Sequence, residues 1–166
     1  MSLLLAVLIS SCAVGDARTC AGPDFSGCDL RGADLTGKRL DGRDFSYAQL
    51  QGADLSNASL VGANLRFTKL DLADLSDANL SGADLFEANL DRADLSHANL
   101  RGAVFDLAFL WRADLTGANA SMASFRWAEL NHAKLELANI EGADFSSADL
   151  SDTILENSSL DVDRED

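Results

Sequence analysis

The sequence is poor in proline, in aromatic residues and in basic residues, and these shortages exclude several classes of protein. It has one proline and 12 glycines among 166 residues, which excludes collagen-like and proline-rich disordered chains. Lysine and arginine number 13 against 27 acidic residues, so the formal net charge is −14. Because such a field repels phosphate groups, it argues against direct binding of nucleic acid and of anionic lipid.

The N-terminus has only a short hydrophobic run. The apolar run Leu3–Ile9 has seven residues, far fewer than the roughly 20 that span a bilayer, but enough for a short signal-peptide core. Ile9-Ser10-Ser11-Cys12 resembles a bacterial lipobox, although no Lys or Arg precedes the run. We expect residues 1–19 to be a signal peptide or lipoprotein signal plus a short linker, with Cys12 as the lipidation candidate. The protein would then be exported, either periplasmic or membrane-anchored; the alternative is an N-terminal strand or cap on a cytoplasmic protein.

The three cysteines are consistent with export. If Cys12 carries lipid, Cys20 and Cys28 remain as a pair eight residues apart, which could close a small disulfide loop in an oxidising compartment. The alternative is that Cys28 is simply a small buried residue, as free cysteine often is.

A repeat of five residues dominates the rest of the chain. From Phe25 to Leu160 every fifth residue is large and apolar except Ala120, and these 28 positions hold 21 Leu, 5 Phe, 1 Ile and 1 Ala. The residue two places earlier is alanine at 21 of the 28 positions. A period of five suits neither an α-helix, at about 3.6, nor a β-strand, at about 2. The pattern predicts a winding with one short straight segment and one turn in every five residues.

The motif Ala-Asp/Asn-Leu-x-x, as in Ala53-Asp54-Leu55 and Ala83-Asp84-Leu85, resembles the pentapeptide-repeat family over residues 24–160. In that family four pentads form one square coil, with the central Leu or Phe and the preceding Ala pointing inward. The resemblance implies an all-β solenoid: a right-handed quadrilateral parallel β-helix of about seven coils over residues 20–160, followed by an acidic tail at 161–166.

The sequence also supports a coil of twenty residues independently of the resemblance. All five central phenylalanines fall at positions equal modulo 20, and so do six glycines, which predicts two columns of stacked residues. These are Phe25, Phe45, Phe105, Phe125 and Phe145, and Gly22, Gly42, Gly62, Gly82, Gly102 and Gly142. The glycine column predicts one corner whose turn needs a positive φ.

Five aspartates on one predicted face form an acidic ladder at Asp34, Asp54, Asp74, Asp94 and Asp114. One interpretation is a mimic of nucleic-acid phosphates or a weak strip for divalent cations. The other, which we favour, is that Asp is the consensus residue at these positions and keeps the rod soluble.

A second surface feature is apolar. Six outward-facing residues form a candidate protein-contact patch: Tyr47, Phe67, Leu107, Phe109, Trp111 and Trp127. Exposed aromatic residues in a chain with only 7% aromatics indicate a contact site, and we expect the last four of the patch to lie close together. The alternatives are self-association as a homodimer and residues that merely shield the backbone.

The sequence carries no sign of catalysis. His97 and His132 fall on different predicted corners, and two histidines without a third ligand make no zinc site. Neither a phosphate-binding Gly-Lys-Ser/Thr loop nor a Gly-x-Ser-x-Gly elbow occurs. We therefore expect no catalytic residues, no metal site and no cofactor.

The function that we expect is a non-catalytic scaffold or protein-binding module at the bacterial cell envelope. It would bind an unknown protein partner and attach to the membrane through lipidated Cys12. The family resemblance implies an alternative, because some pentapeptide-repeat proteins are acidic DNA mimics that bind DNA gyrase and topoisomerase IV and protect them from quinolones.

Overall fold

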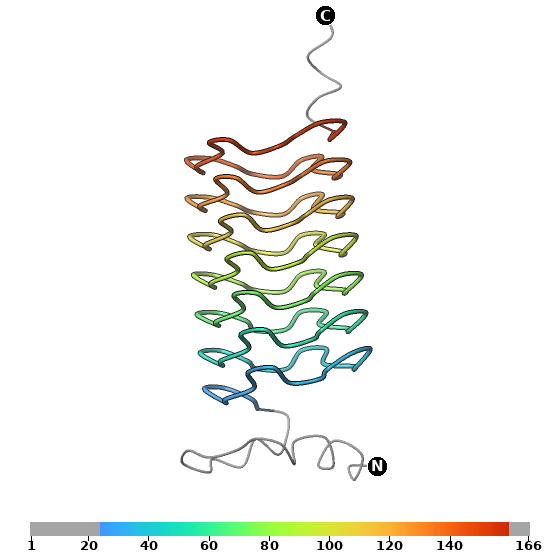
Figure 1. The fold of residues 1–166 in the computed structure, drawn as a ribbon, viewed down its shortest axis with the longest axis vertical. Coiled ribbons are helices and arrows are strands. Elements are labelled where there is room, and N and C mark those ends of the chain that lie inside the picture. The colour runs from blue at the N-terminus through green and yellow to red at the C-terminus, as the bar shows by residue number, and fades with distance from the viewer. Residues whose placement is uncertain (1–23, 160–166) are drawn as a thin grey trace, which may run out of the picture.

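In a computed structural model, which describes residues 24–159, the backbone winds into a rod of stacked four-sided coils (Figure 1). Within that range there is no helix and no strand longer than one residue. Isolated parallel bridges instead join residues twenty apart, from Asp24–Asp44 to Lys134–Ile154. The predicted coil of twenty residues is therefore confirmed, and the described range holds nearly seven coils. Positions equal modulo 20 lie above one another, and we call each such set a column.

A repeat that has Asp or Asn before its central residue can pair all of its backbone N–H groups, as residues 53–57 illustrate. The N–H of Ala53 donates to the carbonyl of the central leucine three residues earlier, at 3.0 Å, which closes a β-turn. The N–H groups of Asp54, Leu55 and Asn57 donate to carbonyls of the adjacent coils at 2.7–2.9 Å. The N–H of Ser56 donates to Oδ1 of Asp54 at 3.0 Å. Because an unpaired backbone N–H is costly, this scheme explains why Asp or Asn so often precedes the central residue.

Every corner has a positive φ at the same place, the second residue after the central one. The angle is 62° at Gly52 and 66° at Gly82, but it is also 60° at Tyr47 and 61° at Trp127. A β-turn with a positive φ only at its third residue is type II, where glycine fits best. Seventeen of these turn positions hold a residue other than glycine. The predicted positive φ at the corner of the glycine column is therefore confirmed, and the structure adds that the other three corners share the same turn.

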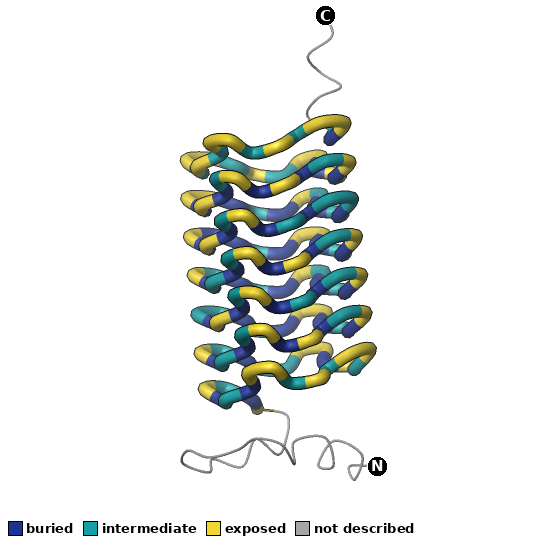
Figure 2. The backbone as a smooth tube through the Cα atoms, viewed as in Figure 1, coloured by how far each residue is buried: buried dark blue, intermediate teal, exposed yellow. Residues whose placement is uncertain are grey.

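The core is filled by the central leucines and phenylalanines and by the alanines that precede them. The predicted phenylalanine column is confirmed: the rings of Phe105 and Phe125 stack with centroids 4.8 Å apart, and those of Phe125 and Phe145 4.9 Å apart. Figure 2 shows buried residues lining the interior and exposed residues at the corners. Burying each such Leu or Phe contributes about 1.5–3 kcal/mol. Even Ala120, the exception to the repeat, is fully buried.

Cys28 occupies an alanine position in the first described coil, where it is buried and disulfide-bonded. Cys12 and Cys20 lie outside the described residues, as do residues 1–19 and the tail at 161–166. The lipidation of Cys12, the pairing of Cys20 with Cys28 and the domain boundaries therefore stay predictions.

Candidate functional site

One corner of the rod carries large apolar side chains at turn positions that favour glycine. These side chains form a single column, which we call the apolar corner: Tyr47, Phe67, Leu107 and Trp127, with Glu87 between Phe67 and Leu107. The exposed fraction is 63% for Tyr47, 41% for Leu107 and 63% for Trp127. The left-handed conformation costs a residue other than glycine about 1–2 kcal/mol. Tyr47, Leu107 and Trp127 thus gain neither burial nor a favourable turn conformation from their positions, whereas Phe67 is half-buried.

The N-terminal half of the apolar corner is an aromatic stack. The rings of Tyr47 and Phe67 are nearly parallel, 10° apart, with centroids 4.8 Å apart. Phe86 meets Phe67 edge to face at 5.7 Å. The Arg66 guanidinium lies 4.2 Å from the Phe86 centroid and donates to Asp84 at 2.9 Å.

Sequence analysis missed Phe86 and Arg66 as members of this surface. Both occupy the turn position just before the apolar column. Comparing columns at both outward turn positions, rather than at one, would have found them.

Beside the C-terminal half of the apolar corner lies an ion pair between the buried carboxylate of Asp106 and the exposed guanidinium of Arg126. Asp106 is only 7% exposed and accepts hydrogen bonds from Nε of Arg126, at 2.9 Å, and from the Ser124 hydroxyl. Burial acts to raise the pKa of Asp106, but the hydrogen bonds from Arg126 and Ser124 outweigh it and lower the pKa. The pair therefore neutralises both charges beside the exposed side chains of Leu107 and Trp127.

Trp111 belongs to the next corner and has different neighbours. Its ring lies 4.9 Å from the guanidinium of Arg92 and 4.4 Å from that of Arg112, and it meets the His132 ring edge to face at 6.5 Å. The ring contacts of residues 24–159 do not join Trp111 to the other aromatic residues of the predicted patch.

The predicted contact patch thus extends from the apolar corner over the adjoining face to the corner of Trp111. Phe109, which is 42% exposed, lies on the face between the apolar corner and the corner of Trp111. As the sequence indicated, Leu107 and Trp127 share one column, and Phe109 and Trp111 lie in two others.

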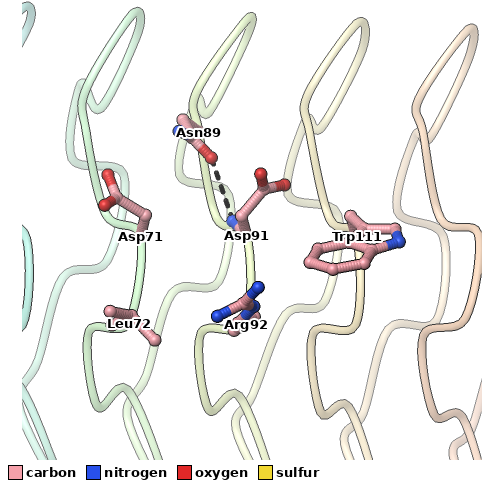
Figure 3. Close-up of a pocket in the computed structure, with 6 residues that line it drawn as sticks. All are labelled: Asp71, Leu72, Asn89, Asp91, Arg92 and Trp111. Carbon is pink, nitrogen blue, oxygen red and sulfur yellow. Dashed lines mark hydrogen bonds between the residues drawn. The ribbon is translucent and has the colours of Figure 1, made fainter.

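A shallow hollow lies beside Trp111 and spans three coils (Figure 3). Its volume of about 200 Å³ is below the roughly 300–1,000 Å³ of small-molecule sites. Burial raises the pKa of Asp91, and the nearby Asp71 carboxylate raises it further. A hydrogen bond from the Trp111 backbone N–H and the positive charge of Arg92 act in the opposite direction. The other lining residues are Leu72 and Asn89.

The acidic ladder has a structural role in the turns. Oδ1 of each of its five aspartates accepts the backbone N–H two residues later, at 2.9–3.1 Å. Hydrogen bonds from Thr36 and Ser56 lower the pKa of Asp34 and of Asp54, respectively. Asp and Asn residues make the same bond on other faces, for example Asn79 and Asp144. This agrees with the interpretation that Asp is a consensus turn residue.

The part of the chain described by the structure has no group of three His, Cys, Asp or Glu side chains arranged to hold a metal ion. It also has no helix of the length and hydropathy needed to cross a membrane. His97 and His132 lie in different columns and on different corners, as expected.

Comparison with known proteins identifies the repeat. Pentapeptide repeats, in eight copies, match residues 24–60, 58–96, 83–121, 93–130 and 123–161. No protein with a curated description matches the chain.

Several solved structures are similar to this chain. One is HetL, a pentapeptide repeat protein involved in heterocyst differentiation regulation in the cyanobacterium Nostoc sp. strain PCC 7120. It is 35% identical to this chain, the match covers 81% of this chain and 75% of the HetL chain, and the TM-score is 0.42. A pentapeptide repeat protein of the Arabidopsis thaliana thylakoid lumen is 36% identical over 74% of this chain and 72% of its own, with a TM-score of 0.28.

Trypsin-treated QnrB1, a plasmid-mediated fluoroquinolone resistance protein, is 17% identical over 82% of this chain and 86% of its own, with a TM-score of 0.50. Pentapeptide repeat proteins form right-handed quadrilateral β-helices, so the expected fold is confirmed. The repeat motif, its eight copies and the identity with HetL together show that this chain belongs to the pentapeptide-repeat family.

Proposed function

We propose that this protein is a non-catalytic protein-binding module that contacts its partner through the apolar corner. The observation that carries the proposal is that Tyr47, Leu107 and Trp127, all exposed and at positive φ, share one column. Leu72, Met122 and Leu137 are exposed at positive φ too, but each lies singly on another corner. Each position carries backbone strain and exposes apolar surface, and exposed apolar surface that gathers in one place marks an interaction site. Exposed aromatic residues of this kind are typical anchors of protein interfaces.

Family membership supports the non-catalytic part of the proposal. Pentapeptide repeat proteins are generally non-catalytic scaffolds, and the matches indicate no enzyme family. The hollow beside Trp111 is small and open, and the guanidinium of Arg92 in it already lies 4.9 Å from the Trp111 ring. The apolar corner therefore remains the best candidate for a functional surface.

In-cell photo-crosslinking would test the proposal directly. A photo-crosslinking amino acid placed at Trp127 should give a discrete protein adduct. The matched control is Leu137, which is 64% exposed at a φ of 59° on the opposite corner, and it should give none. Equal labelling at both positions, or no adduct at Trp127, would contradict a contact through the apolar corner.

We further propose that the protein works at the bacterial cell envelope. The apolar run Leu3–Ile9 and the lipobox-like Cys12 support this location, and so does the disulfide bond of Cys28, because disulfides persist in oxidising compartments. The intact mass of the protein from membrane, periplasmic and cytosolic fractions tests it. A diacylated species that begins at Cys12 in the membrane fraction is the expected result, whereas a full-length cytosolic chain would overturn it.

The net charge of −14 favours a second candidate, an acidic DNA mimic that binds DNA gyrase or topoisomerase IV. We rank it lower because the ladder carboxylates already bond to turn amides, and Asp114 also pairs with Lys134 at 2.8 Å. A gyrase supercoiling assay with a quinolone separates the two candidates. Protection of supercoiling by the purified protein would favour the DNA mimic.

A further inference from the structure

We propose, building on the proposed function, that the apolar corner binds a helical segment that presents one Lys or Arg between two apolar residues. What carries the inference is the position of Glu87, an exposed carboxylate in the middle of a column of apolar side chains. The partner's cation would face Glu87, and its apolar residues would contact Phe67 on one side and Leu107 on the other.

Glu87 is the uncompensated charge of this corner. Arg66 pairs with Asp84 at 2.9 Å, and Arg126 pairs with Asp106. Among residues 24–159 no ion pair joins Glu87 to a cation, and Lys69 on the adjoining face is exposed. A partner that covered Glu87 with apolar groups alone would desolvate an unpaired carboxylate, which is strongly unfavourable. A partner that fits the corner must therefore bring a positive charge to this point.

The spacing of the column indicates a helix. Adjacent coils lie about 4.8 Å apart, so Phe67 and Leu107, two coils apart, are separated by about 10 Å along the rod. On an α-helix, residues i and i+7 lie on one face about 10.5 Å apart, with i+3 and i+4 between them. An extended strand covers about 10 Å in three residues, but residues i and i+3 then point to opposite faces.

The charge of the whole chain supports the same partner chemistry. With a net charge of −14, the rod attracts basic segments and repels acidic ones, which increases the encounter rate and selects against wrong partners. Tyr47 and Trp127, at the ends of the apolar corner, lie four coils or about 19 Å apart. A helix of about 13 residues covers that length.

Selection from a library of helical peptides tests the inference with the full chain. The library would present positions i, i+3, i+4 and i+7 of a 16-residue helix as randomised residues. We expect selected peptides to carry apolar residues at i and i+7 and Lys or Arg at i+3 or i+4. Glu87→Gln should weaken the binding of a selected peptide about tenfold, which is 1.4 kcal/mol, and Glu87→Lys should weaken it further.

Asp77→Asn is the matched control. Asp77 is exposed with a φ of 57° at the same turn position on the opposite corner, and Glu87 has a φ of 52°. Both substitutions remove one negative charge, so unequal effects cannot come from net charge. Two results would overturn the inference but leave the proposed function standing. One is selected peptides that bind the corner but lack a basic residue, and the other is peptides that bind Glu87→Gln and the parent equally. Failure to select any peptide whose binding depends on Trp127 would overturn the inference too, and crosslinking at Trp127 would then decide separately whether the proposed function holds.

Discussion

The role of the acidic ladder can be tested at its central residue, Asp74. Oδ1 of Asp74 accepts the Ser76 N–H at 2.9 Å and the Ser76 hydroxyl at 2.6 Å. The residue bridges to Asp54 in one neighbouring coil and to Asp94 in the other. Its side chain therefore stabilises its own turn but is repelled by two like charges. Asp74→Asn removes the charge and keeps the acceptor, whereas Asp74→Ala removes both.

The expected magnitudes follow from the coil spacing. Two unit charges about 4.8 Å apart repel by about 0.9 kcal/mol in water. Asp74→Asn should therefore raise the free energy of unfolding by up to about 1.7 kcal/mol at low salt, and by roughly half of that at physiological ionic strength. Asp74→Ala removes the same charge repulsion but also removes the hydrogen bond to the turn, so this variant should be less stable than Asp74→Asn by about 1 kcal/mol.

Urea denaturation, followed by circular dichroism at low, physiological and high salt, measures both the charge repulsion and the contribution of the hydrogen bond. The Asn and Ala variants should differ by a constant amount at every salt concentration, because the hydrogen bond is local. The gain of the Asn variant over the parent should shrink as salt increases. If the two variants are equally stable, the carboxylate does not support the turn; a gain that salt leaves unchanged would refute the electrostatic part of the argument.

Three further predictions concern the core, the acid response and the apolar corner. Phe125→Ala should lower the free energy of unfolding by about 3–5 kcal/mol, because this ring is stacked between two others; a loss below 1 kcal/mol in urea denaturation would show that the column readily repacks. The pKa values of Asp34 and Asp54 are lowered from 3.8 in the folded chain. The stability that these two carboxylates contribute is therefore fully present above pH 3.8 and is lost as pH falls through their folded pKa values. A circular dichroism titration should show no loss of folded structure between about pH 7 and 5. Trp127→Ser should leave the unfolding midpoint in urea within error of the parent while abolishing adduct formation from a crosslinker at Tyr47; a large drop in the midpoint would assign Trp127 to stability instead.

Much of the fold could be predicted from the sequence, because the determinants of a solenoid are local and repeated. A central apolar residue at every fifth position and alanine two places earlier establish which side chains face inward. The modulo-20 alignment of Phe105, Phe125 and Phe145 established the length of the coil, since stacked aromatic rings require the same position in successive coils. Residue type and spacing are sufficient for these conclusions because each repeat contacts only its neighbours.

The candidate site was only partly predictable. The sequence placed Tyr47, Phe67, Leu107 and Trp127 in one outward column, but it could not show that Phe86 turns its ring onto Phe67. Nor could it show that the cations next to the column are already paired while Glu87 is not. These contacts depend on which way each side chain leaves a corner, and residue spacing carries no information about that direction.

The sequence by itself determined the repeat, the coil length, the inward residues and the acidic character of this protein. Only the tertiary structure decided that all four corners share a positive φ and that the ladder aspartates accept turn amides. It also showed that the ring of Trp111 lies against Arg92, Arg112 and His132. The physical reason is that periodicity determines which residues share a column, whereas turn conformation, hydrogen bonding and ion pairing depend on the backbone path and on neighbours in adjacent coils.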